Sequence, residues 1–158
     1  MIFFVFVTKL TIFQKRKDTE MRKQKECLKE MERQMMEREE MIAKTRDFLC
    51  GYQLCIDMLN LRKYERRRLQ GFDGESACED ILAGDEAYWR ARMYEVGALL
   101  GAMKNGREKL LLYYHYVRGE SIEHAANLIG VSRRTGYRLH QRGLLSASFL
   151  LKRMEFLA

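Results

Sequence analysis

Four arginines lie within ten residues near the end of the chain: Arg133, Arg134, Arg138 and Arg142. A guanidinium group can hold a phosphate, or the O6 and N7 atoms of guanine, with two hydrogen bonds. Helical residues three or four positions apart share a face, so these side chains would form one basic surface. The chemistry this segment can do is the binding of a polyanion, with or without recognition of base edges.

The rest of the sequence offers no comparable candidate for catalysis. His124 and His140 have no second histidine or carboxylate at metal or acid–base spacing, so we expect a partly buried surface residue and a helix-face residue. There is no glycine-rich loop of the kind that cradles phosphates. We therefore predict a protein that is not an enzyme, with no catalytic residue, no metal and no cofactor.

The four cysteines, Cys27, Cys50, Cys55 and Cys78, do not indicate secretion. We expect reduced packing thiols in a cytoplasmic protein, rather than disulfides or a zinc site.

The net charge of +7 is unevenly distributed along the chain. Residues 104–158 contain ten Lys or Arg and four Asp or Glu, whereas residues 71–88 contain six acidic residues and no basic one. Basic residues placed against phosphates release counterions and add affinity that does not depend on sequence. The surplus therefore favours a polyanionic partner for the C-terminal part.

Two short helices joined by a tight turn are predicted around the arginines. A helix over 107–118, with an apolar face of Leu110, Leu111, Tyr114 and Val117, ends at Gly119. Ser121 caps the next helix, Gly130 permits a sharp turn, and Ser132 caps the last helix. The residues that we expect to fill this helix–turn–helix over 121–143 are Ile122, Ala125, Ala126, Ile129, Gly130, Val131 and Leu139.

The last helix, which begins at Ser132, is the candidate recognition helix. Its side not used by Leu139 would carry the contacts to bases and phosphates that such a helix makes in the major groove. The candidate DNA-binding residues are Ser132, Arg133, Arg134, Thr135, Tyr137, Arg138, Gln141 and Arg142.

The segment EKLLLYYHYVRGESIEHAANLIGVSRRTGYRLHQRGL, residues 108–144, resembles the promoter-reading region 4 of bacterial sigma factors. It is more similar still to small sigma-like regulators of phages and prophages, including ArpU-type late-gene activators. The resemblance implies binding to double-stranded promoter DNA, contact with RNA polymerase, and use of residues 132–142 as the recognition helix. Position 136 departs from the family pattern, because Gly136 stands where Val or Ile is usual. Glycine costs about 1 kcal/mol in a helix interior, which puts the rigidity of the recognition helix in doubt.

The heptad pattern of the N-terminal part predicts a long charged helix over 21–70 with coiled-coil character. One heptad position holds Met21, Leu28, Met35, Ile42, Leu49 and Ile56, and the other holds Gln24, Met31, Arg38, Thr45, Tyr52 and Leu59. The polar residues in this seam and Gly51 favour a partly coiled helix that is broken near Gly51. Such a seam could pair within the chain or form a homo-oligomer, and the sequence leaves both open. Residues 1–20 begin with an apolar stretch too short to span a membrane, and we expect a loosely attached segment or an over-long start, with a packed segment or a membrane anchor as the alternatives.

The chain contains no proline, so an all-α fold is predicted. An acidic, glycine-rich loop is expected over 71–84, followed by a helical DNA-binding domain over 85–158. The first helix of that domain would run from about Asp85 to Lys104, with one apolar stripe of Trp89, Met93, Val96, Leu100 and Met103. The basic segment 61–70 could contact phosphates or favour a helix C-terminus.

The function predicted from these features is regulation of transcription by sequence-specific binding to double-stranded DNA, without a membrane. Two alternatives remain. A small-subunit-like DNA-packaging protein of a terminase would combine a helix–turn–helix with oligomerising helices. A helical scaffold or adaptor would use the basic face to bind an acidic protein.

Overall fold

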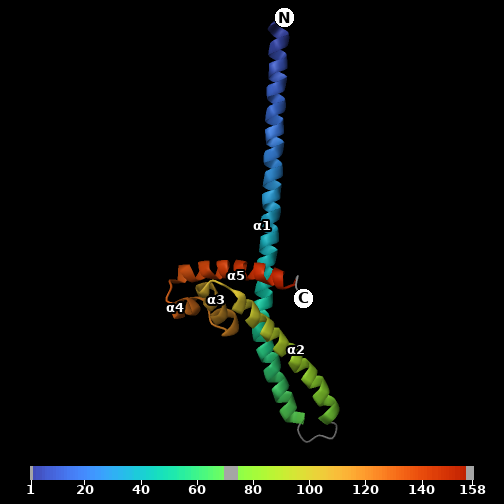
Figure 1. Ribbon diagram of the computed structural model, residues 1–158, viewed down its shortest axis with the longest axis vertical. Helices are drawn as coiled ribbons and strands as arrows, with labels where there is room; N and C mark the ends of the chain where they lie inside the picture. Colours follow the sequence, from blue (N-terminus) through green and yellow to red (C-terminus); the bar gives the residue numbers. More distant parts are fainter. Residues whose placement is uncertain (1, 70–74, 156–158) are drawn as a thin grey trace. The chain divides into compact units, whose positions relative to one another are not determined.

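The computed structural model describes the backbone of residues 2–69 and 75–155, and side chains over 20–68 and 83–155. Its elements are the helices α1 (Ile2–Leu69), α2 (Glu75–Ala102), α3 (Gly106–Leu112), α4 (Ile122–Leu128) and α5 (Arg133–Glu155), with a π-helical turn η1 (Tyr113–Val117) after α3 (Figure 1). These described residues contain no strand, so the predicted all-α fold is confirmed. The chain divides into two compact units, Met1–Glu40 and Met41–Ala158.

Helix α1 is continuous, and the predicted break near Gly51 is wrong. A single glycine costs only about 1 kcal/mol in a helix, and Leu49 and Cys55 on either side of it are buried. The helix begins at Ile2, while the expectation of a loosely attached segment concerns residues 1–20, whose side chains, except that of Glu20, lie outside those described.

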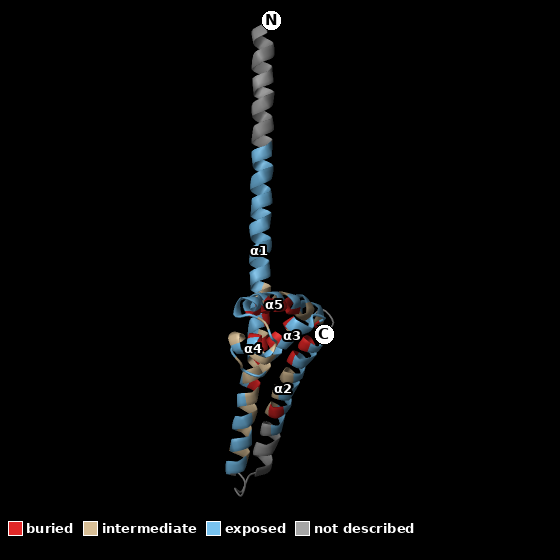
Figure 2. Ribbon diagram, turned by 90° about the vertical axis from the view of Figure 1, so that its left-hand side faces the viewer, coloured by how far each residue is buried: buried red, intermediate tan, exposed pale blue. Residues whose placement is uncertain are grey.

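In the first unit, every described side chain from 20 to 40 is exposed. Figure 2 shows this part of α1 as a continuous exposed surface. The heptad residues Met21, Leu28, Met31 and Met35 therefore have no cover within this unit.

Helix α2 begins at Glu75, ten residues earlier than predicted, so the expected loop over 71–84 is mostly helical. Acidic residues near a helix N-terminus are stabilised by the helix dipole, which explains why this acidic stretch folds as a helix. Its acidic residues also meet the basic end of α1. Arg62 forms an ion pair with Asp85, and Arg66 Nη2 lies 2.7 Å from Glu86 Oε1. Part of the basic segment 61–70 therefore holds α1 to α2.

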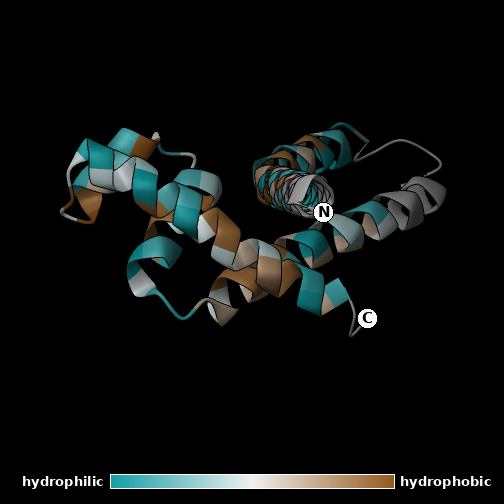
Figure 3. Cartoon of the chain, turned by 90° about the horizontal axis from the view of Figure 1, so that it is seen from above, coloured by the Kyte–Doolittle hydropathy of each residue, from teal (hydrophilic) through white to brown (hydrophobic). Residues whose placement is uncertain are grey.

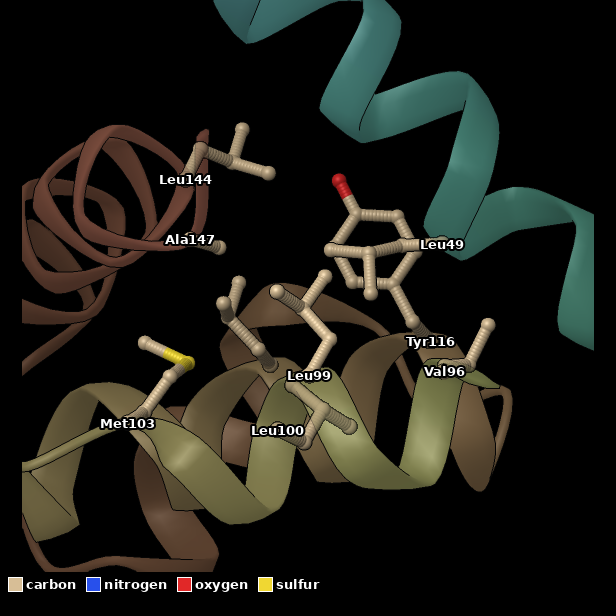
Figure 4. Packing of buried hydrophobic residues seen from close by; sticks show 9 residues of the cluster. Leu49, Val96, Leu99, Leu100, Met103, Tyr116, Leu144 and Ala147 are labelled. Atoms are coloured by element: carbon tan, nitrogen blue, oxygen red, sulfur yellow. The ribbon is translucent and has the colours of Figure 1, made fainter. Parts of the chain in front are cut away.

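The main hydrophobic core lies where α1, α2, α3, η1 and α5 meet (Figure 4). Val96, Leu100 and Met103 of the predicted α2 stripe are buried, whereas Trp89 and Met93 are half-buried. The other buried members are Leu49, Leu99, Leu112, Tyr116, Leu144 and Ala147. Because Leu49 of α1 belongs to this core, the compact unit begins at Met41 and not at the predicted boundary of 85.

The heptad seam of α1 is covered within the chain from about residue 41 onward. Thr45 and Leu49 are buried, and Ile42, Tyr52 and Ile56 are half-buried. For this half of the seam, pairing occurs inside the chain.

The π-helical turn η1 follows directly after α3. Arg118 N donates to Tyr113 O over 3.1 Å, a bond that spans five residues rather than four. The buried residues of this region are Leu111 and Leu112 of α3 and Tyr116 of η1, which follows Leu112 by four positions. The predicted face is therefore only partly correct: Leu110 is exposed, and Tyr114 and Val117 are half-buried.

Gln53 of α1 closes the end of η1. Its Nε2 donates to Val117 O over 2.7 Å and to Tyr116 O over 3.2 Å. The last carbonyls of a helix otherwise lack partners, so this side chain ties α1 to the segment that precedes the helix–turn–helix.

No helix among the described residues is long and apolar enough to cross a membrane.

Candidate nucleic-acid interface

The helix–turn–helix is formed by α4, a short turn and the first part of α5. Ser121 caps α4, since its Oγ accepts from His124 N over 3.1 Å, as predicted. Gly130 has a φ of +70°, the left-handed conformation that glycine adopts without strain. Val131 N donates to Ala126 O over 3.0 Å and completes the turn.

Ser132 begins the recognition helix as its N-cap. Its Oγ accepts a hydrogen bond from Thr135 N over 3.3 Å, and the two hydroxyl oxygens lie 2.9 Å apart. This cap satisfies one of the backbone donors at the start of α5. The first turn of α5, the candidate recognition helix, carries Arg133 and Arg134 and is thereby held in place.

Gly136 allows α4 and α5 to touch. A Cβ atom at this position would lie 2.6 Å from the Cβ of Ala126 and 3.6 Å from the carbonyl oxygen of Ile122. Gly136 is buried, and α5 continues through it to Glu155. The doubt about this position concerned the rigidity of the helix; the structure gives Gly136 a packing role, because the missing side chain makes room for the neighbouring helix.

A small core lies beneath the recognition helix. Ala125, Ala126 and Leu139 are buried with Leu111 of α3, and Ile129 and Val131 pack against them half-buried. Two predicted core residues differ. Ile122 is half-buried at the edge, and Gly130 is exposed, so it shapes the turn rather than filling the core.

Helix α5 belongs to both cores of the compact unit. Its first half contributes Leu139 to the small core, and its second half contributes Leu144 and Ala147 to the main core. The recognition helix is therefore attached through its whole length to the body of the unit.

The opposite side of α5 is open to solvent. All eight predicted DNA-binding residues are exposed: Ser132, Arg133, Arg134, Thr135, Tyr137, Arg138, Gln141 and Arg142. Figure 3 shows mostly hydrophilic residues along the first half of α5 and more hydrophobic ones along the second. An open depression is lined by Thr135, Tyr137, Arg138, Gln141 and Arg142.

The four arginines differ in how they are engaged. Arg133 Nη2 lies 2.7 Å from Glu123 Oε1 of α4, and Tyr137 Oη donates to the same oxygen over 3.4 Å. Arg134 and Arg138 form no ion pair with any described residue. Their positive charges are the ones most available to an external anion.

Arg142 is engaged with a buried carboxylate. Its Nε lies 3.7 Å from Oε1 of Glu108, which belongs to the first turn of α3 and is buried. Glu108 also accepts hydrogen bonds from Ser146 Oγ over 3.1 Å and from Asn105 Nδ2 over 3.0 Å. Arg142 therefore helps to join α5 to α3, besides being exposed.

The burial of the two histidines differs from the prediction. His124 is exposed, whereas His140 is buried between α5 and η1. Tyr116 Oη lies 3.0 Å from His140 Nε2. Burial lowers the pKa of His140 to about 4, with smaller effects of His115 and Arg46 in the same direction. Burial likewise raises the pKa of Tyr116 to about 12, so a protonated hydroxyl and a neutral imidazole share this hydrogen bond.

No cluster of three or more His, Cys, Asp or Glu that could hold a metal occurs among the described residues. Cys55 is a buried packing thiol whose pKa is raised by burial. Cys27 and Cys50 are exposed, contrary to expectation, and Cys78 lies outside the described side chains.

The exposed face of α5 extends beyond the predicted residues. Phe149 follows Arg142 by seven positions and is exposed, and Lys152 is exposed in the next turn. The spacing of seven from Arg142 was the available signal for this extension.

The chain matches no family model, no curated protein and no solved structure.

Proposed function

We propose that this chain is a sequence-specific regulator of transcription, of phage or prophage type, that binds double-stranded DNA through α5. The observation that carries the proposal is the exposure of Arg134 and Arg138 without an ion pair to a described residue. Both are exposed near the start of a capped helix, and neither forms an ion pair with a described residue. The opposite side of the same helix is buried in the body of the unit.

This arrangement is suited to the major groove for two physical reasons. The groove is wide enough to admit one α-helix, and the side chains of its first turns then reach the base edges. The second reason is that the helix is fixed by the Ser132 cap and the Ala126–Gly136 contact, so little conformational entropy is lost on binding.

The remaining arginines have different roles in the proposed complex. Arg133 can exchange its ion pair with Glu123 for a phosphate, because its own side chain is 70% exposed. Arg142 would touch DNA while keeping its contact with Glu108. Contact with RNA polymerase is part of the proposal through the resemblance to sigma region 4, and no particular surface is assigned to it.

The test is the binding of a fluorescent random-sequence 30-base-pair duplex, followed by anisotropy over a range of salt concentrations. The variant Arg134→Ala/Arg138→Ala removes the two unpaired arginines. We expect its affinity to fall at least tenfold, and the salt slope to fall by about 0.9 for each arginine that contacts a phosphate.

The matched control is Lys63→Ala/Arg67→Ala on α1. These two residues are also exposed, four positions apart and without an ion pair to a described residue. We expect this variant to bind within about twofold of the wild type at moderate salt, since only long-range attraction is lost. Equal losses for the two variants would show diffuse attraction rather than binding by α5. Unchanged binding by the α5 variant would favour an adaptor that meets an acidic protein.

A further inference from the structure

The part of α1 between residues 20 and 40 exposes an apolar seam. Met21, Leu28 and Met35 recur every seven residues, and Met31 lies between the last two. More than half of the accessible surface of each of the four is exposed. Apolar side chains aligned on one side of an otherwise charged helix mark an interaction surface.

The seven-residue spacing indicates that the partner is another helix. A heptad repeat keeps apolar residues facing a neighbouring helix over several turns, which an irregular surface does not require. The same register continues along α1 to Thr45 and Leu49, which are buried by helices of the unit Met41–Ala158. One register therefore has helical partners in its second half and is uncovered in its first.

The charge distribution of residues 20–40 is complementary to that of a second copy running in the opposite direction. Residues 20–29 contain four basic and two acidic residues, whereas residues 30–40 contain two basic and five acidic residues. Two copies aligned in parallel would place halves of the same net charge side by side. Two copies aligned antiparallel would place the basic half of one beside the acidic half of the other.

We propose that residues 20–40 pair with the same segment of a second copy as an antiparallel coiled coil. In the register that best covers the seam, Leu28 faces the partner's Met31, and Met31 faces the partner's Leu28. Lys25 of each copy then lies beside Glu32 of the other, and the two pairs lie along the same flank of the coiled coil. Neither Lys25 nor Glu32 forms an ion pair with a residue of its own chain that the structure describes. This pairing does not depend on DNA binding, because it uses a different unit of the chain.

The first test measures the mass of the full-length chain by sedimentation equilibrium. We expect the wild type to have twice the chain mass at micromolar concentration. Leu28→Glu should weaken self-association at least tenfold, since it places a charge in the seam. The matched control is Met36→Glu, whose side chain is even more exposed, at 71%, but lies off the seam; it should remain dimeric. A monomeric wild type, a ring of eight or more copies as in a packaging protein, or equal effects of the two variants would overturn the proposal.

The second test decides the orientation. Lys25→Glu should weaken the dimer several-fold, and the double variant Lys25→Glu/Glu32→Lys should restore it, because the reversed pair attracts again in the antiparallel register. In a parallel dimer Lys25 would face the partner's Glu20, and adding Glu32→Lys would not restore association. Failure of the double variant to recover would therefore overturn the antiparallel arrangement. Circular dichroism serves as the folding control, and duplex binding of monomeric Leu28→Glu separates this result from that of the proposed function.

Discussion

His140 is the clearest example of a side chain whose role is set by its surroundings. It was expected on a helix face, and it is buried against Tyr116, whose hydroxyl forms a hydrogen bond with its neutral ring. His115 and Arg46 are the charged or titratable groups that lower its pKa further. Nothing in the local spacing of the sequence signals this burial, because it depends on contact with Tyr116, 24 positions earlier in the chain.

The lowered pKa of His140 predicts a pH-dependent stability. In the unfolded chain the imidazole takes up a proton below about pH 6.5, whereas in the folded chain it stays neutral down to about pH 4. The free energy of unfolding should therefore fall as the pH drops from 6.5 toward 4, by about 2 kcal/mol at pH 5 relative to pH 7. Urea unfolding at the two pH values measures this difference.

The variants His140→Gln and His124→Gln separate the buried histidine from the exposed one. His140→Gln should remove most of the pH dependence, since glutamine can still accept from Tyr116 and does not titrate. His124→Gln should leave the pH dependence as in the wild type. A pH dependence that survives in His140→Gln would assign it to other groups.

At the scale of the elements, the contact between α4 and α5 determines where the recognition helix lies. The turn, its glycine and both serine caps follow from local residue preferences, and the sequence predicts them correctly at Ser121, Gly130 and Ser132. Gly136 could not be interpreted from the sequence alone. Its meaning depends on Ala126, a residue of another helix, and such contacts are not visible in local patterns.

The close contact predicts that Gly136→Ala is destabilising, although alanine is the better helix former. We expect a loss of about 1 to 3 kcal/mol, because two Cβ atoms cannot lie 2.6 Å apart and the helices must separate. Gly51→Ala on α1 is the control, since no atom lies within 4 Å of the added Cβ; it should stabilise by up to about 1 kcal/mol. Chemical unfolding of both variants compares them. A stabilised Gly136→Ala protein would contradict the contact.

Element boundaries were predicted less well than the helix–turn–helix. The start of α2 at Glu75 was missed because glycine and acidic residues usually indicate a loop, and here Arg62 and Arg66 of α1 offset the acidic charge of Asp85 and Glu86. The apolar face in this region was partly wrong because Leu112 and Tyr116 pack into the main core, whereas Leu110 is exposed. Both errors arise from interactions between elements, which a fixed period does not contain.

At the scale of the whole molecule, the two units have different tasks in the proposed function. Every side chain of residues 20–40 is exposed. Their apolar seam is the surface that we propose pairs with a second copy. The unit Met41–Ala158 holds both hydrophobic cores and presents the arginine face of α5. The predicted domain boundary at 85 divided this second unit, because the sequence does not reveal that Leu49, in the middle part of α1, belongs to its core.

The central claim is that the exposed face of α5 recognises a DNA sequence, and selection from a randomised duplex library tests it most directly. The wild type should enrich one motif, and Arg138→Ala should bind the same library with a relaxed preference at one or two base pairs of that motif, since a bidentate contact to guanine contributes about 1 to 3 kcal/mol of discrimination. The Lys63→Ala/Arg67→Ala control should enrich the wild-type motif. If the wild type enriches no motif, or if Arg138→Ala together with Arg134→Ala enriches the same motif to the same degree, α5 is not the recognition helix.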